Sequence, residues 1–246
     1  MKTPIYFISD IHLRLSLDKK EKERRAKLYR LLDTIKKDGG TIFFVGDLFD
    51  FYFEYPHMIP KSFSDFYKKA NDLKTNGVKL FFLAGNHDYW VGDYIKNELM
   101  DEVYLNDIAI EVNNKKLYIT HGDGLLSWDH GYRLLKRATR SKLFVNMFKL
   151  LHPTVAYKIA NFISKSGKHS SEKAELSENI RSELKSFAKK KFDNGFDYMI
   201  SGHYHLGEMH VMNNCKLAIL GDWFSRPSYA VFDGEELYFN LWGEDD

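Results

Sequence analysis

Aspartate, histidine and asparagine side chains follow short apolar runs at five places in the chain, where each run ends. The central example is the run 80–84, which stops at Gly85 and is followed by Asn86, His87 and Asp88. The run is too short for a helix and predicts a buried strand, and the glycine permits a tight turn. We expect the polar residues at the carboxyl end of that strand, where open α/β sheets bind ligands.

The other four runs end in the same kinds of side chain. The residues that follow them are Asp10 and His12, Asp47 and Asp50, His121, and His203 and His205. In an extended segment, residues two apart point to the same side, so the Asp-x-His and His-x-His pairs can each act together. Their donor atoms suit divalent ions such as Mn²⁺, Fe²⁺ or Zn²⁺, and the lack of a thiolate argues against a structural zinc site. Asp47 follows a glycine, so both of its carboxylate oxygens could bridge two ions.

Parallel strands with crossover helices are predicted for the beginning of the chain. Apolar runs at 5–9, 41–45 and 79–84 alternate with a helix over 18–38 and a second helix that Ser62 would cap. Later segments are richer in antiparallel strands. We expect strands at 103–112, 116–120, 198–201, 216–220, 229–233 and 236–241, with a hairpin turn at 113–114. This order predicts two packed sheets with helices outside.

Residues 124–195 separate two of the site-bearing strands and have a helical pattern, with one helix over 172–191, so we interpret them as a cap over the site. Between Arg133 and Lys173 there are ten Lys or Arg and one Glu, a charge of +9, which leaves −7 for the remainder of a chain with net charge +2. Aliphatic residues are interleaved with these cations. The segment is therefore either a solvated helical face or, as we prefer, a surface for an anionic substrate or a membrane.

The composition limits the class of protein. The chain has 246 residues, 44% of them apolar, which is enough for one large domain with a hydrophobic core. The single cysteine, Cys215, excludes an intrachain disulfide framework and is compatible with a reducing cytosol. No run of 18 apolar residues occurs, so we expect neither a signal peptide nor a membrane-spanning helix.

Taken together, the motifs Asp-x-His, Gly-Asp-x-x-Asp, Gly-Asn-His-Asp, His-Gly and Gly-His-x-His resemble those of the calcineurin-like metallophosphoesterase superfamily. The resemblance implies an α/β fold, assigned to α+β in some schemes: a four-layer α/β/β/α sandwich with an inserted helical cap. The implied core is 1–123 and 196–246, and the implied cap is 124–195.

The resemblance also implies roles for individual residues. One metal ion would be held by Asp10, His12 and His205, and a second by Asn86, His121 and His203, with Asp47 bridging them. The implied cofactors are two divalent ions, Mn²⁺ first, with Fe²⁺ or Zn²⁺ as alternatives, which activate a hydroxide for attack on phosphorus. His87 matches the catalytic histidine, Asp88 would orient it, and Asp50 would support a metal ligand. Asp50 and Asp88 could instead be loop caps.

The position of the cap resembles that in the UDP-2,3-diacylglucosamine pyrophosphatases of lipid A synthesis. The residues after the last motif, Leu220–Trp223 and Ser228-Tyr229, are also similar to those of this family. These enzymes release UMP and 2,3-diacylglucosamine 1-phosphate. The similarity implies a nucleotide-sugar lipid substrate and a cytoplasmic protein held peripherally on the inner membrane by its basic, apolar cap, without nucleic acid or an obligate protein partner. The cap residues that match the substrate neighbourhood, or else form an exposed polar loop, are Asn161, Lys165, Lys168, His169, Ser170, Ser171 and Lys173.

Two departures leave alternatives open. Many members of that narrower family have Arg where this chain has His87, and Ala where it has Asp222. Another metallophosphoesterase acting on a nucleotide, phosphodiester or phosphoprotein therefore stays an alternative, as does a nuclease, although the cations lie among aliphatics rather than stacking aromatics. A non-catalytic scaffold is disfavoured because the whole ligand set is present. His210 could touch the site or lie on the surface.

Overall fold

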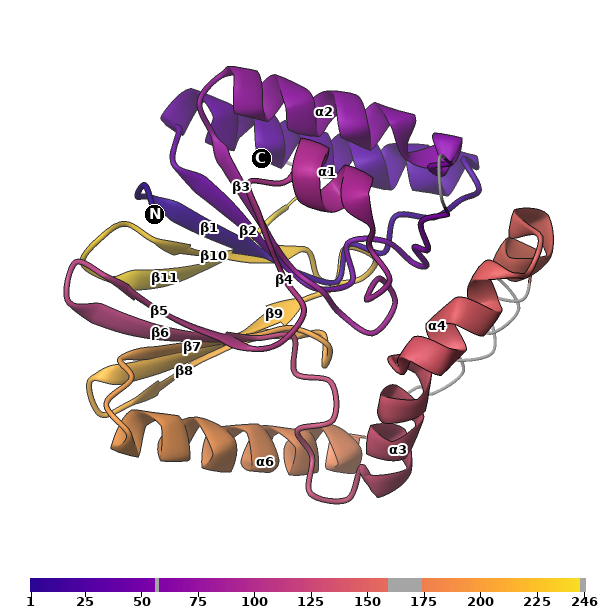
Figure 1. Cartoon of the computed structure of the whole chain (residues 1–246). Helices are drawn as coiled ribbons and strands as arrows, with labels where there is room; N and C mark the ends of the chain where they lie inside the picture. The colour runs from indigo at the N-terminus through magenta and orange to yellow at the C-terminus, as the bar shows by residue number, and fades with distance from the viewer. Residues whose placement is uncertain (56–57, 159–173, 244–246) are drawn as a thin grey trace.

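Two β-sheets packed face to face form the centre of the molecule, with helices on both outer faces (Figure 1). The computed structural model describes residues 1–55, 58–158 and 174–243. One sheet has six strands in the order β11-β10-β1-β2-β3-β4, and the other has five in the order β5-β6-β7-β9-β8. The predicted four-layer α/β/β/α sandwich is thereby confirmed.

The first sheet contains the parallel strands that were expected at the beginning of the chain. Its members are β1 (Ile5–Ile8), β2 (Thr41–Val45), β3 (Lys79–Leu83), β4 (Glu102–Tyr104), β10 (Ser228–Phe232) and β11 (Leu237–Leu241). Strands β1 to β4 are parallel to one another, whereas β10 runs antiparallel to both β1 and β11. Every residue of β1 and β2 is buried, because helices cover one face of the sheet and the second sheet covers the other.

The second sheet has a parallel centre and antiparallel edges. Its members are β5 (Ile108–Val112), β6 (Lys115–Thr120), β7 (Tyr198–Ser201), β8 (Leu206–Met212) and β9 (Cys215–Gly221). Strands β6, β7 and β9 are parallel, and β5 and β8 pair antiparallel at the two edges. Phe7 and Phe43 from the first sheet and Ile119 and Ile200 from the second belong to one buried cluster between the sheets.

Helices α1 (Lys19–Asp38) and α2 (Ser64–Thr75) lie on the first sheet's side of the molecule, together with the single turn η2 (Tyr94–Leu99) (Figure 1). The carboxylate of Asp18 caps α1 by accepting from the backbone N–H of Glu21 at 2.9 Å, and α1 ends at Gly39, whose φ is 75°. The predicted cap of α2 is wrong. Ser62 lies inside a 3₁₀ turn, η1 (Lys61–Phe63), and α2 begins without a side-chain cap.

Two segments differ from their predicted places. The expected strand 103–112 is divided, since β4 pairs with β3 in the first sheet while β5 pairs with β6 in the second. The long helix α6 (Ala174–Asp193) buries Leu184 and Ala188 in a cluster with Met199 and Leu217 of the second sheet. Helix α6 therefore forms the fourth layer, packed on the second sheet. The division into a core and a cap over 124–195 stays a prediction.

Helices α3 (His130–Thr139) and α4 (Lys142–Lys149) extend away from the sandwich, and we call this pair the arm (Figure 1). Its inner side is anchored on the body. Phe148 lies 4.7 Å from Phe53 between ring centroids, and the indole N–H of Trp90 donates to the carbonyl of Thr139 at 3.0 Å. The aromatic residues after β2 thus line a wall that holds the arm beside the site.

Candidate metal centre

The predicted metal ligands and His87 meet at the carboxyl ends of five strands, β1, β2, β3, β6 and β7. Three groups of potential metal ligands, each with donor atoms within 4.8 Å of one another, occur there among the described residues. They are Asp10, His12 and His205; His12, Asp47 and His87; and Asp47, His121 and His203. The group of Asp10, His12 and His205 matches one predicted ion site. The group with His121 and His203 contains two of the three ligands predicted for the other site. The remaining group places His87 beside ligands of both sites.

The carboxylate of Asp47 lies between the two predicted ion sites. Its Oδ2 atom is 3.3 Å from Nε2 of His121 and 3.8 Å from Nε2 of His12. On the first side, Oδ1 of Asp10 is 3.1 Å from Nε2 of His205. On the second side, Oδ1 of Asn86 is 3.2 Å from Nε2 of His121. One carboxylate is therefore placed where it can serve both groups.

Left-handed backbone is concentrated in these residues. Five of the seven predicted ligands have positive φ angles: Asp10 52°, His12 48°, Asp47 51°, His203 69° and His205 55°. This conformation is uncommon for residues other than glycine and costs about 1–3 kcal/mol each. Strain repeated at one place indicates a functional centre.

Burial and neighbouring carboxylates have opposite effects on the pKa values of the histidines at this centre. Burial lowers the pKa of both His12 and His203 to about 4, so both imidazoles are neutral at pH 7 and have a lone pair for a metal ion. Burial also acts on His121, but the carboxylate of Asp47 outweighs it and raises the pKa to about 10. The buried carboxylates thus attract positive charge strongly, and a divalent ion can supply it.

A metal ion fits the first site because the imidazole of His12 is otherwise unsatisfied. Both of its ring nitrogens are buried and have no hydrogen-bond partner among the described residues. Nε2 lies 3.9 Å from Asp10 Oδ1 and 3.8 Å from Asp47 Oδ2, beyond hydrogen-bond reach. Donor atoms that share one ion at about 2.0–2.2 Å lie roughly 3–4 Å apart, which matches these separations. Leaving such a polar group buried and unpaired is costly, so its position favours a cation.

His87 faces the centre through Nε2, which is 3.9 Å from Asp47 Oδ2, while Nδ1 lies 2.7 Å from the backbone carbonyl oxygen of Asp50. Asp88 does not orient the imidazole as predicted. Its two carboxylate oxygens accept from the backbone N–H groups of Gly85 at 2.9 Å and Phe49 at 3.2 Å. Asp88 therefore fixes the loop that carries His87, and the Asp50 carbonyl orients the ring. The Asp50 carboxylate lies 3.7 Å from Nδ1 of His12, close to the ligand it was expected to support.

Several neighbours of the centre were absent from the predicted set. Asp123, two residues after His121, binds two cations of the arm, with Lys136 Nζ at 2.9 Å and Arg140 Nη2 at 3.1 Å from its Oδ2. Asp222 Oδ2 lies 3.6 Å from Nδ1 of His205. The motif His-Gly-Asp offered a signal for Asp123, but the arm cations could be found only in three dimensions. The predicted substrate neighbourhood is outside the described residues: Asn161, Lys165, Lys168, His169, Ser170, Ser171 and Lys173.

A two-sheet sandwich with buried carboxylates and imidazoles at its strand ends defines the class of metallophosphoesterases. The chain matches the calcineurin-like phosphoesterase family over residues 3–207 and belongs to it, which confirms the resemblance. It is 34% identical to a UDP-2,3-diacylglucosamine hydrolase of Porphyromonas gingivalis, over 96% of this chain and 97% of that one. A hydrolase of the same name from Neisseria meningitidis serogroup B is 29% identical over 96% and 97% of the two chains. Vacuolar protein sorting 29 of Cryptosporidium parvum, at 13% identity and a TM-score of 0.50 over 98% of this chain and 90% of that one, shares the fold alone.

Proposed function

We propose that this protein hydrolyses the diphosphate of UDP-2,3-diacylglucosamine, releasing UMP and 2,3-diacylglucosamine 1-phosphate for lipid A synthesis. The similarity to hydrolases of that name extends over nearly the full length of both chains. The observation that carries the proposal is the position of Asp47, whose carboxylate lies within 4 Å of His12 on one side and His121 on the other. That position suits a pair of ions clamping one phosphoryl group.

Two divalent ions, for which we favour Mn²⁺, are the proposed cofactors. Asp10, His12 and His205 would hold one, and Asn86, His121 and His203 the other, with Asp47 shared. When bound, such ions neutralise phosphoryl charge and make water a nucleophile near neutral pH. The protein's own contribution is to hold the ligands on rigid strand ends and to keep the centre largely buried.

His87 is the proposed proton donor. The carbonyl oxygen of Asp50 can only accept a hydrogen bond, so the Nδ1 atom of His87 must carry the proton that is donated to it. The Nε2 atom of His87 faces the metal centre. Burial lowers the pKa of His87, yet the Asp47 carboxylate and the Asp50 carbonyl outweigh burial and raise it overall. A protonated Nε2 can then donate to a phosphoryl oxygen or to the leaving oxygen.

The arm is the proposed contact with the lipid part of the substrate and with the cytoplasmic face of the inner membrane. Its outer side exposes large apolar residues, among them Leu134 at 68% and Leu143 at 72%, and Leu150 at the C-cap of α4 is 87% exposed. Residues 130–149 contain six Lys or Arg and no Asp or Glu, which suits anionic headgroups. In the ranges 1–55, 58–158 and 174–243, no helix is both long enough and apolar enough to cross a bilayer.

Product identification tests the proposal. Purified protein with Mn²⁺ is incubated with UDP-2,3-diacylglucosamine, and the products are separated and weighed by mass spectrometry. We expect UMP and 2,3-diacylglucosamine 1-phosphate in equal amounts. Intact substrate, together with hydrolysis of unrelated phosphodiesters by the same preparation, would refute the lipid assignment and leave a metallophosphoesterase of another specificity.

A further inference from the structure

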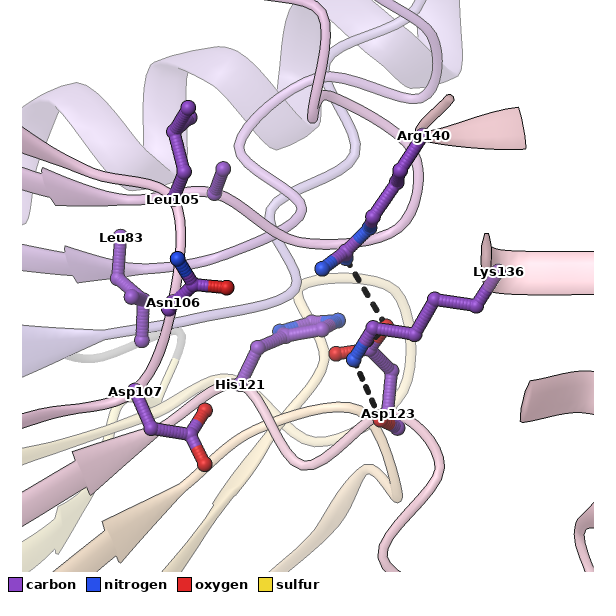
Figure 2. Close-up of a pocket in the computed structure, with 9 residues that line it drawn as sticks. Leu83, Leu105, Asn106, Asp107, His121, Asp123, Lys136 and Arg140 are labelled. Carbon is purple, nitrogen blue, oxygen red and sulfur yellow. Dashed lines mark hydrogen bonds and ion pairs between the residues drawn. The ribbon is translucent and has the colours of Figure 1, made fainter. Parts of the chain in front are cut away.

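A cavity of about 260 Å³ opens on the arm side of the metal centre (Figure 2). Its wall includes the predicted ligand His121 at one point and the arm residues Lys136 and Arg140 at another. Asp107 lies across the cavity from Arg140, and its carboxylate already accepts from the hydroxyls of Tyr118 at 2.7 Å and Thr120 at 2.8 Å. The cavity thus extends from the metal centre to the side chains of Lys136 and Arg140, which are not among the predicted metal ligands.

Arg140 is held in a fixed orientation at the cavity wall. Its Nη2 atom donates to Asp123 Oδ2 at 3.1 Å and to the carbonyl of Gly85 at 3.3 Å, and its guanidinium carbon lies 4.2 Å from the ring centroid of Tyr89. The side chain is only 14% exposed. A guanidinium has five N–H donors, and both side-chain bonds found within the described ranges use Nη2. No bond within those ranges uses the donors on Nη1 and Nε, and Figure 2 shows the group directed from the arm towards His121.

The charges on the arm side of the cavity favour an anion. Lys136 and Arg140 share the single carboxylate of Asp123, so these three groups carry +1, whereas the Asp107 carboxylate on the opposite wall accepts from the hydroxyls of Tyr118 and Thr120. A planar guanidinium fork is suited to the oxygens of a phosphoryl group, more than an ammonium is. The ring of Tyr89 and the carbonyl of Gly85 hold the fork in place before a ligand arrives, which limits the entropy lost on binding.

We propose that Arg140, assisted by Lys136, binds the second phosphoryl group of the diphosphate, next to the one attacked at the metal centre. The assignment rests on the proposed function and deepens it. Arg140 contacts Gly85 and Asp123, which are one and two residues from the predicted ligands Asn86 and His121. Arg140 thus contacts residues next to the predicted metal ligands and not the ligands themselves. This is the position expected for a group that binds the phosphate beside the one at the metal centre.

The test compares UDP with UMP, which lacks the second phosphoryl group. Binding to Mn²⁺-loaded protein is measured by isothermal titration calorimetry. Wild-type protein should bind UDP more tightly than UMP. Because hydrogen bonds to charged groups contribute about 1.5–3 kcal/mol, Arg140→Gln should weaken UDP binding about 10- to 100-fold and leave UMP binding unchanged. Arg137→Gln is the matched control, since Arg137 lies in the last turn of α3, whose C-cap is Arg140, carries the same charge and is exposed. It should alter neither affinity.

A conservative variant separates binding from a structural role. Arg140→Lys keeps a cation beside Asp123 but loses the fork, so it should show an intermediate affinity for UDP with unchanged Mn²⁺ content and melting temperature. The assignment is overturned if wild-type protein binds UDP no better than UMP, if Arg140→Gln leaves UDP binding unchanged, or if Arg140→Lys weakens UDP and UMP equally. The proposed function is judged separately, by wild-type cleavage of UDP-2,3-diacylglucosamine, so either proposal can fail alone.

Discussion

Gly85 lies directly against the carboxylate of Asp47, so closely that a Cβ added to Gly85 would overlap the Oδ1 atom. The same oxygen accepts from the backbone N–H of His87 at 2.9 Å. The loop after β3 therefore positions the carboxylate proposed to bridge the ions, and only glycine leaves room for it. The first glycine of the Gly-Asn-His-Asp motif is required by packing against the metal centre as well as by the turn.

Replacing Gly85 with alanine should damage the centre without unfolding the protein. The added methyl group pushes the Asp47 carboxylate out of place, and disturbing the support of a ligand typically costs about 10- to 100-fold in metal affinity. Mn²⁺ titration followed by calorimetry measures the loss. Gly131→Ala is the control, because a Cβ there meets nothing within 4 Å. Equal Mn²⁺ affinity in the two variants would contradict the packing argument.

Replacing His87 with alanine should slow turnover and spare the metal. Loss of a positioned proton donor typically reduces the rate about 10²–10⁴-fold. Steady-state kinetics and Mn²⁺ content are measured on the same preparation. His210→Ala serves as the control, because the His210 imidazole lies 2.8 Å from Glu208 on the same strand and outside the three ligand groups. Loss of bound Mn²⁺ in His87→Ala would show that His87 is a ligand and refute the assigned role.

The local sequence signal was sufficient for the first three strands and the residues at their ends. A short apolar run followed by Gly or Asp specifies both a buried strand and a turn, so β1 to β3 and the polar residues after them lie where they were predicted. Such a signal does not say which sheet a strand joins. The apolar residues of 103–112 therefore gave no sign that β4 and β5 belong to different sheets. Strand β8 was not predicted at all, since its edge position leaves much of it half-exposed.

Features that depend on three-dimensional contact could not be predicted. The amphipathic pattern of α6 fits a helix over the site and a helix on a sheet equally well, and packing of Leu184 against the second sheet decides between them. The left-handed backbone at His12 follows from the demands of the centre rather than from its own propensity. Arg140 and Asp123 are seventeen residues apart, and no spacing rule joins them.

Metal binding should stabilise the fold. The carboxylates of Asp10 and Asp47 are buried, and the His12 nitrogens have no hydrogen-bond partner in the part of the chain that the structure describes, so a bound divalent ion should lower the free energy of the folded protein. At a free Mn²⁺ concentration of 100 times Kd the gain is ~2.7 kcal/mol, a rise in melting temperature of roughly 5–10 °C over the EDTA-treated protein. Asp47→Asn should lose most of this rise. A melting temperature that does not respond to Mn²⁺ would contradict the prediction.

The exposed apolar side of the arm should govern attachment to lipid. Burying a leucine side chain contributes about 1.5–3 kcal/mol, so Leu143→Gln combined with Leu150→Gln should weaken binding to vesicles containing anionic phospholipid by at least about tenfold. Co-sedimentation with the vesicles measures it. Val211→Gln on β8 is the control, since Val211 is 64% exposed but lies on the body. If the double variant sediments as the wild type does, the arm is not the lipid contact.

Anomalous diffraction from crystals soaked in Mn²⁺ tests most directly whether seven side chains hold two ions. We predict two peaks on either side of the Asp47 carboxylate, one against Asp10, His12 and His205, the other against Asn86, His121 and His203. A single peak, or peaks away from these residues, would contradict the two-ion centre from which the proposed hydrolysis follows.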